Sequence, residues 1–300
     1  MKYRALIATL ALAVVVAAPS IGAFSSTPAV KDPAITGLFD GSPIVARAAK
    51  RFGGAIYSLT WRDKEFINSS DNGRELQSAS SFDGLGESYN PTEAGNRWDR
   101  GRRSTSLVLS LSMTGNTLEG ETQMAFWRGG LSQHILKRNI TIGFLGIPNV
   151  IRHRLTFVVP EAHKSATFEA LTGYMPPEFS RFYTYDPAAH TLARLSDGPG
   201  EQSLPVILAT ADGDYAMGVY SPQPNMAKHA GYGRFRFPAQ QVVKWNCVFR
   251  LADIVPGAYQ TECDSIIGSL KDVEAAMAEL YAKTSGRLQT ASSTGPAPLH

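Results

Sequence analysis

Short segments in which apolar and polar residues alternate occupy much of the chain from Gly54 onward. Ala55 to Trp61 is the first, and Arg62-Asp63-Lys64 then turns the chain toward a return strand at Glu65–Asn68. Because successive side chains of a strand point to opposite faces of a sheet, this alternation predicts strands. Further predicted strands are Ser104–Met113, Glu121–Trp127, Ile135–Ile142, Asn149–Val159, Ser180–Asp186, Val206–Ala209, Tyr215–Tyr220, Arg234–Phe237, Val242–Leu251 and Tyr259–Gly268.

One segment near the C-terminal end has helical spacing instead. Apolar residues recur about every four positions at Val273, Met277 and Leu280, between Ser269 and Gly286. The combined pattern predicts an all-β, mainly antiparallel protein: a large two-sheet β-sandwich with one C-terminal helix near residues 271–283. The sequence has no repeat of blade length, which counts against a β-propeller.

The N-terminal residues are predicted to lie outside this fold. Residues 1–23 combine a basic start, an apolar run from Ala5 to Ala18 and a small-residue end, which is the layout of a secretory signal peptide. The apolar run is too short to span a bilayer comfortably. We therefore expect a periplasmic or secreted protein with no membrane segment after cleavage. Residues 24–48 are predicted to be an N-terminal arm, 49–285 a single sandwich domain and 286–300 a disordered tail.

The composition is that of a folded chain with little net charge. The 300 residues are 43% hydrophobic and 18% charged, and 29 Lys and Arg against 26 Asp and Glu give a net charge of +3. A chain this apolar is not disordered throughout. The balance lacks the positive excess that drives nonspecific nucleic-acid binding, so we expect no nucleic-acid partner. The sequence leaves the oligomeric state open.

Cys247 and Cys263 are the two cysteines of the chain. An even number in an exported protein indicates a disulfide, and the two predicted strands that carry them are joined by the turn sequence Pro256-Gly257. A bridge across this hairpin is feasible, and two free thiols are the alternative. Two cysteines without clustered histidines do not complete a tetrahedral set, and no phosphate or dinucleotide motif is present. We expect neither a metal nor another cofactor.

The segment from Asn68 to Asp99 has no clear apolar period and is predicted to be a long loop. Loops beyond about 15 residues are uncommon unless functional. Carboxylates and amides can bond to the hydroxyl pairs of a sugar while aromatic rings pack on its C–H faces, and this segment holds all three groups. A structural loop whose polar groups satisfy one another is the alternative.

Two further polar groups lie downstream. His134, His153 and His163 fall within 30 residues, but their spacing matches no metal motif. A lone histidine on a strand is more often packed than catalytic. Glu169 and Tyr174 form the second group. We expect His134, His153, Glu169 and Tyr174 to lie across a cleft from the polar segment.

One part of the sequence resembles a known family. Gly53-Gly54-Ala55-Ile56-Tyr57-Ser58-Leu59-Thr60-Trp61, followed by Lys64-Glu65-Phe66-Ile67-Asn68 and Asp71-Asn72-Gly73-Arg74, resembles the opening hairpin of galactose mutarotase-like proteins. That superfamily includes aldose 1-epimerases, and its sandwich recurs in glycoside hydrolases and polysaccharide lyases. The resemblance implies a fold and a carbohydrate ligand. The histidine loop and late catalytic glutamate strand of epimerases have no clear match, so no catalytic residue is carried over.

We therefore expect an exported carbohydrate-active protein, foremost a glycoside hydrolase that uses carboxylate acid/base chemistry. Its candidate catalytic residues are Asp83, Glu87, Glu93 and His153. A noncatalytic glycan-binding protein is one alternative, and a polysaccharide lyase with a His or Tyr base and Arg or Asn for charge stabilisation is another. The residues expected to bind substrate are Asp71, Asn72, Arg74, Gln77, Asn90, His134, Glu169 and Tyr174.

Overall fold

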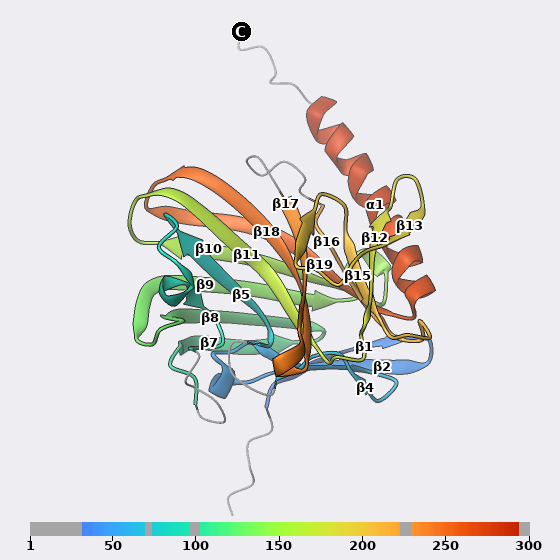
Figure 1. Cartoon of the computed structure of the whole chain (residues 1–300), viewed down its shortest axis with the longest axis horizontal. Coiled ribbons are helices and arrows are strands. Elements are labelled where there is room, and N and C mark those ends of the chain that lie inside the picture. Colours follow the sequence, from blue (N-terminus) through green and yellow to red (C-terminus); the bar gives the residue numbers. More distant parts are fainter. Residues whose placement is uncertain (1–31, 70–73, 97–102, 223–229, 294–300) are drawn as a thin grey trace, which may run out of the picture. The chain divides into compact units, whose positions relative to one another are not determined.

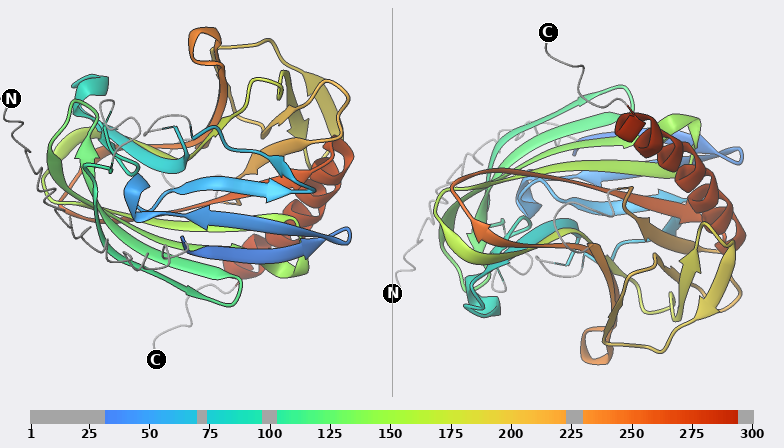
Figure 2. Two further views of the ribbon diagram at one scale, coloured as in Figure 1. Left: turned by 90° about the horizontal axis from the view of Figure 1, so that it is seen from below. Right: turned by 90° about the horizontal axis from the view of Figure 1, so that it is seen from above.

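The structure, a computed structural model, describes residues 32–69, 74–96, 103–222 and 230–293. All strand pairs among the described residues are antiparallel, and most of the strands are alternating segments of the sequence. The pairings form two large sheets, as predicted. Both views in Figure 2 show that the long strands are curved and run alongside one another.

The first sheet carries the candidate site described below. Its strands, in spatial order, are β1 (Ala34–Phe39), β2 (Ser42–Ala48), β3 (Ile56–Trp61), β5 (Leu76–Phe82), β11 (His163–Met175), β18 (Val242–Ile254), β17 (Ala230–Phe237) and β14 (Gly200–Gln202). The two-residue strand β4 (Lys64–Glu65) extends β3 as a hairpin.

The second sheet contains the remaining long strands. Its members, in spatial order, are β13 (Thr191–Arg194), β12 (Arg181–Asp186), β15 (Val206–Ala209), β16 (Ala216–Tyr220), β19 (Gly257–Gly268), β10 (Val150–Val159), β9 (Leu131–Ile142), β8 (Thr117–Phe126) and β7 (Leu107–Thr114). A short strand, β6 (Pro91–Thr92), pairs with β5 on one side and β8 on the other, and so joins the two sheets.

Apolar side chains from both sheets share one core. Trp61 of β3, Leu136 of β9 and Phe249 of β18 are each buried in the same cluster. Burial of alternate side chains from both sheets is what the period-two pattern predicts for a sandwich. The fold class expected from the sequence is therefore confirmed.

The disulfide between Cys247 and Cys263 is present, and its Cα atoms are 6.6 Å apart. Its setting differs from the expected hairpin. Cys247 lies on β18 and pairs with Leu171, whereas Cys263 lies on β19 and pairs with His153. The turn after Ile254 thus carries the chain from one sheet to the other, and the bridge crosses the core between them.

The single long helix, α1 (Leu270–Ser293), packs beside β15, β16 and β19 (Figure 1). The Ser269 hydroxyl caps it by accepting the backbone N–H of Asp272, and the Asp272 carboxylate accepts the N–H of Ser269 in return. The helix continues past Gly286, where a tail was expected to begin. Within the described residues, no helix combines the length and apolar composition that crossing a membrane requires.

Two other expectations need correction. The C-terminal part of the predicted 24–48 arm forms β1 and β2, which pair with each other and through β2 with β3. The predicted loop Asn68–Asp99 contains β5, the short helix η2 (Glu87–Tyr89) and β6. The other short helices are η1 (Lys50–Phe52), η3 (Phe144–Gly146) and η4 (Pro238–Gln240).

Strand β5 escaped prediction because small polar residues occupy its buried positions. Ser78 and Ser80 are 1% and 2% exposed. The Ser78 hydroxyl donates to the carbonyl of Ala170 at 2.6 Å, so its burial does not leave a polar group unsatisfied. A hydroxyl satisfied in this way can occupy a buried position in place of an apolar side chain. The alternation of apolar and polar residues that marks a strand is then absent from the sequence.

Candidate functional site

An irregularity in β11 determines which of its side chains share a face. Glu169 pairs with Val248 of β18, and Leu171 pairs with the adjacent residue Cys247. Ala170 therefore has no counterpart on β18 and is an extra residue in β11. The pairing with β5 shows the same extra residue. A β-bulge of this kind restores the alternation after one additional position. Glu169, Thr172 and Tyr174 therefore lie on one face of the sheet.

The two neighbouring strands add polar side chains to this face. Gln77 of β5 pairs with Thr172, Lys244 of β18 pairs with Tyr174, and Asn246 of β18 pairs with Thr172. Together with the residues near η2 they enclose a pocket of about 70 Å³, hereafter the Glu169 pocket. Its lining residues are Gln77, Ala79, Glu87, Asn90, Thr92, Trp127, Glu169, Thr172, Tyr174 and Lys244.

An ion pair lies at the base of this pocket. Lys244 Nζ donates to Glu169 Oε2 at 2.9 Å, and the Thr172 hydroxyl donates to the same oxygen at 3.0 Å. Burial alone would raise the pKa of Glu169, but Lys244 and the hydrogen bonds outweigh it and lower that pKa. Burial would likewise lower the pKa of Lys244, and Glu169 raises it instead. Both groups are therefore charged at neutral pH.

Tyr174 lies beside this ion pair. Lys244 Nζ is 5.1 Å from the centroid of its ring and 5.1 Å from that of Phe235. Burial raises the pKa of Tyr174, and the negative charge of Glu169 adds to the rise, whereas Lys244 opposes it. Tyr174 is thus a neutral phenol at neutral pH, able both to donate and to accept a hydrogen bond.

Asn246 supports the pair from the side of β17. Its side-chain oxygen accepts the N–H of Gly233 at 2.8 Å, and it also bonds to Glu169. A Cβ atom at Gly233 would lie 2.3 Å from that oxygen. Glycine is therefore required at position 233 for Asn246 to approach this closely.

The rim of the pocket is held by backbone hydrogen bonds. Trp127 N–H donates to the Asn90 carbonyl at 2.9 Å, and Asn90 N–H donates to the Glu87 carbonyl at 3.0 Å. These bonds fix the β8–β9 turn against η2. An aromatic ring, an amide and a carboxylate are placed in this way at the mouth of a pocket whose base is charged.

The structure brings together five of the residues predicted from the sequence, namely Gln77, Glu87, Asn90, Glu169 and Tyr174. Arg74 lies close enough to Tyr174 to lower its pKa slightly. Asp71 and Asn72 fall outside the described residues. Thr172, Trp127 and Lys244 also line the pocket, but they were not among the residues expected from the sequence to bind substrate.

Two predicted catalytic residues lie in the interior instead. Glu93 is 1% exposed and pairs with Arg138 at 2.5 Å, and its other oxygen accepts the N–H of Ser78. His153 is fully buried, and its Nε2 lies 3.0 Å from the hydroxyl of Ser265. Neither side chain can touch a ligand on the surface, so their roles in this structure are structural.

Asp83, predicted to be catalytic, and His134, predicted to bind substrate, belong to a different cluster. Asp83 Oδ2 lies 2.8 Å from His163 Nδ1, and this partner lowers the pKa of Asp83. His134 lies in the same cluster, and burial, with a smaller effect of His163, lowers its pKa to about 4. Neither Asp83 nor His134 lines the Glu169 pocket.

Replacing His153 by glutamine should flatten the pH dependence of stability in mildly acidic solution. Burial, with Arg138 and Arg152, lowers the pKa of folded His153 to about 3, against 6.5 for an unperturbed histidine. Between these values only the unfolded chain takes up the proton, so stability is lost as the pH falls below 6.5. The loss is about 1.4 kcal/mol per pH unit.

Urea unfolding of the parent and His153→Gln between pH 6.5 and 4.5 measures this effect. Asp264, whose pKa burial raises to about 6, acts with the opposite sign but is present in both proteins. The difference between them therefore reports His153. Parallel curves for the two proteins would show that His153 does not titrate as described.

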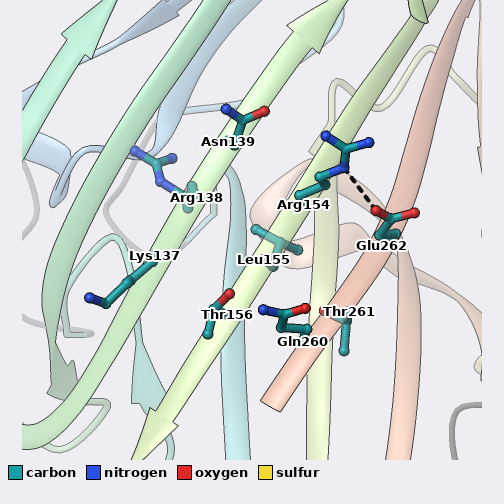
Figure 3. A pocket seen from close by; sticks show the side chains of 9 residues that line it. All are labelled: Lys137, Arg138, Asn139, Arg154, Leu155, Thr156, Gln260, Thr261 and Glu262. Atoms are coloured by element: carbon teal, nitrogen blue, oxygen red, sulfur yellow. Dashed lines mark hydrogen bonds and ion pairs between the residues drawn. The ribbon is translucent and has the colours of Figure 1, made fainter. Parts of the chain in front are cut away.

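A second hollow lies over β9, β10 and β19 and has a volume of about 270 Å³. Figure 3 shows its nine lining side chains, with the Arg154–Glu262 ion pair at 2.8 Å. Lys137 is similarly matched by Glu121 at 3.6 Å. Arg154 and Lys137 are more than half exposed, so water already solvates these charges. None of the residues that line this hollow is aromatic, and it is the weaker candidate for a sugar site.

Comparison with known proteins does not identify the function of this chain. No family model and no curated protein matches the chain. Similar solved structures include an alpha-galactosidase from Lactobacillus brevis, with 12% identity, a TM-score of 0.48 and coverage of 83% of this chain and 42% of that one. A 4-alpha-glucanotransferase from Thermococcus litoralis has 10% identity, a TM-score of 0.43 and coverage of 80% and 40%.

A third similar structure is a GalM/aldose epimerase homologue from C. elegans, with 9% identity, a TM-score of 0.41 and coverage of 80% of this chain and all of that one. This chain spans about two fifths of the length of the first two proteins. At these identities the activities belong to those proteins alone.

Proposed function

We propose that the protein binds a carbohydrate in the Glu169 pocket. The observation that carries this proposal is the convergence of an aromatic ring, two amides, a phenol and a charged pair from separate strands and turns on one pocket. Side chains of these kinds match the two surfaces of a sugar, its hydroxyl groups and its C–H faces. Few hydrophobic side chains compete for the same space.

Each part of the pocket has a role in this proposal. Trp127 at the rim packs against a C–H face of the sugar. Gln77 and Asn90 supply amide groups, and Tyr174 supplies a hydroxyl that can donate or accept. Because Lys244 and Glu169 neutralise each other, the base of the pocket presents hydrogen-bonding groups without an unmatched charge. This favours a neutral glycan over an acidic one.

Hydrolysis of the bound glycan is a second candidate function. Glu87 and Glu169 both line the pocket, and a glycoside hydrolase needs two carboxyl groups on either side of the scissile bond. Lys244 keeps Glu169 ionised, which suits a nucleophile or base. Glu87 at the exposed rim would then be the acid that protonates the leaving oxygen.

We also propose that the protein acts outside the cytoplasm. The signal-peptide pattern of residues 1–23 is one support. The disulfide between Cys247 and Cys263 is another, because such bonds persist in oxidising compartments. Fractionation of expressing cells tests this part directly, and retention of the uncleaved chain in the cytoplasm would contradict it.

Trp127→Ala should weaken glycan binding by about tenfold or more, because large aromatic side chains dominate many binding sites. A panel of soluble oligosaccharides screened by calorimetry on the purified protein identifies the ligand and gives the affinity. Asn90→Ala should weaken the same ligand, whereas Asn139→Ala, a matched change in the hollow of Figure 3, should not. Equal affinities for all three variants and the parent would place the ligand elsewhere.

The same panel separates binding from catalysis. Release of new reducing ends that stops in Glu87→Gln, with binding retained, would establish hydrolysis. Release of unsaturated products would indicate a lyase instead. Binding without any product would leave the protein a glycan-binding module.

A further inference from the structure

Three potential metal ligands converge at one end of the β9–β10–β11 region. They are His134 on β9, Glu161 in the turn between β10 and β11, and His163 at the start of β11. One donor atom from each lies within 4.8 Å of the other two. Glu161 Oε1 is 3.9 Å from His134 Nε2 and 3.5 Å from His163 Nε2.

His134 is buried without a hydrogen-bonding partner. The residue is 3% exposed, and neither of its ring nitrogens has a hydrogen-bond partner among the described residues. Phe82 packs against its ring with centroids 4.8 Å apart. An unsatisfied buried donor or acceptor destabilises the folded state, so His134 favours a ligand that the described residues do not supply.

His163 is oriented as a metal ligand would be. Its Nδ1 lies 2.8 Å from Asp83 Oδ2, and Phe82 stacks on its ring at 4.3 Å. When Nδ1 carries the proton and donates to Asp83, Nε2 keeps a free lone pair, and that atom is the one that faces Glu161. A carboxylate that fixes the tautomer of a metal-binding histidine is the usual companion of such a site.

We propose that His134, His163 and Glu161 bind one divalent transition-metal ion, and that this ion is Zn²⁺. Two imidazoles and one carboxylate form a common zinc donor set, whereas Ca²⁺ and Mg²⁺ prefer oxygen ligands alone. Water fills the fourth position of a tetrahedral ion. This proposal differs from the expectation from the sequence that no metal is bound.

The observed spacing allows the ligands to close on an ion. Bonds of about 2.0–2.1 Å in a tetrahedral site place donor atoms somewhat more than 3 Å apart. The Glu161–His163 distance is already close to this value. Glu161 is about half exposed on a turn, so its side chain can move toward His134 without disturbing the core.

Such a site would fasten the β10–β11 turn to β9 and, through Asp83, to the end of β5. It shares no lining residue with the Glu169 pocket. The proposal is therefore independent of carbohydrate binding.

Calorimetric titration of the chelator-treated purified protein with ZnCl₂ tests the site. We expect one ion per chain and a rise in Tm on binding, because a ligand of the native state stabilises it. CoCl₂ provides the spectroscopic probe, and tetrahedral Co²⁺ should give strong visible absorption bands. A parent protein that binds no Zn²⁺ at about a hundred micromolar and shows no Co²⁺ bands would overturn the proposal.

Ligand and control variants locate the ion. Glu161→Gln and His163→Asn should each weaken Zn²⁺ binding at least tenfold, and His190→Asn, a matched change at an exposed histidine, should not. Asp83→Asn tests the positioning residue, and it should weaken binding about 10- to 100-fold while the Tm of the metal-free protein changes little. Asparagine tolerates the positive φ of 53° at position 83. Unchanged affinity in both ligand variants would place the metal elsewhere and overturn the assignment.

Discussion

Replacing Arg138 by methionine should lower the free energy of unfolding by about 3–5 kcal/mol, because the change leaves a buried carboxylate without its counter-ion. Arg138 and Glu93 are 2% and 1% exposed, and their charged atoms are 2.5 Å apart. Arg138 Nη2 also donates to the carbonyl of Gly54 at 2.5 Å. The arginine therefore holds the segment before β3 as well as the segment after β6. Urea unfolding followed by circular dichroism measures the loss.

Two further variants separate charge from packing. Arg138→Met combined with Glu93→Leu removes both charges and should recover much of the loss, since a hydrophobic replacement of a buried pair is often tolerated. Arg154→Met breaks the exposed pair with Glu262 and should cost less than about 1 kcal/mol. A small effect of Arg138→Met alone would mean that Glu93 is neutral in the folded protein.

Breaking the bond between Cys247 and Cys263 should lower the free energy of unfolding by about 3 kcal/mol. The bridge closes a segment with a sequence separation of 16 residues, and the loss of chain entropy in the unfolded state for a loop of that size gives this magnitude. Guanidinium unfolding with and without a phosphine reductant measures it on the same chain. The reduced parent keeps both buried sulfur atoms, so the comparison reports the cross-link rather than a packing change.

The double variant Cys247→Ala/Cys263→Ala provides the matched control. It should match the reduced protein to within the small cost of two missing sulfur atoms. Detection of two reactive thiols in the denatured, unreduced protein would contradict the disulfide, and so would equal stability of the oxidised and reduced chains.

The strands were predictable where each buried a regular row of apolar side chains. Ala55 to Trp61 and Asn149 to Val159 are examples, and the corresponding strands β3 and β10 lie at or close to the expected positions. Strand β5 was not predicted, because serines occupy buried positions in it and the hydroxyl of one of them, Ser78, is satisfied by the backbone carbonyl of Ala170. A pattern based on hydrophobicity has no means of recognising such a partner.

The sequence indicated the kind of side chains that form the site, but it did not identify all of the residues correctly. Carboxylates and amides between residues 68 and 99 indicated sugar binding, and Gln77, Glu87 and Asn90 do line the pocket. Lys244 was not selected because only the pairing of β11 with β18 places it beside Glu169. Glu93 was expected to be a catalytic residue, but the fold places it in the interior, where it pairs with Arg138.

The extra residue at position 170 also shows how the first sheet accommodates the insertion of a residue in one of its strands. Both β5 and β18 pair regularly with β11 before and after this residue. The insertion therefore changes the pairing only locally and does not shift the rest of the strand. A bulge bends and twists the strand that carries it. Deletion of Ala170 would therefore leave Glu169 and Tyr174 on the same face but straighten the strand beneath them. The curvature of β11 beneath the pocket, rather than the identity of the residues that face it, depends on this one alanine.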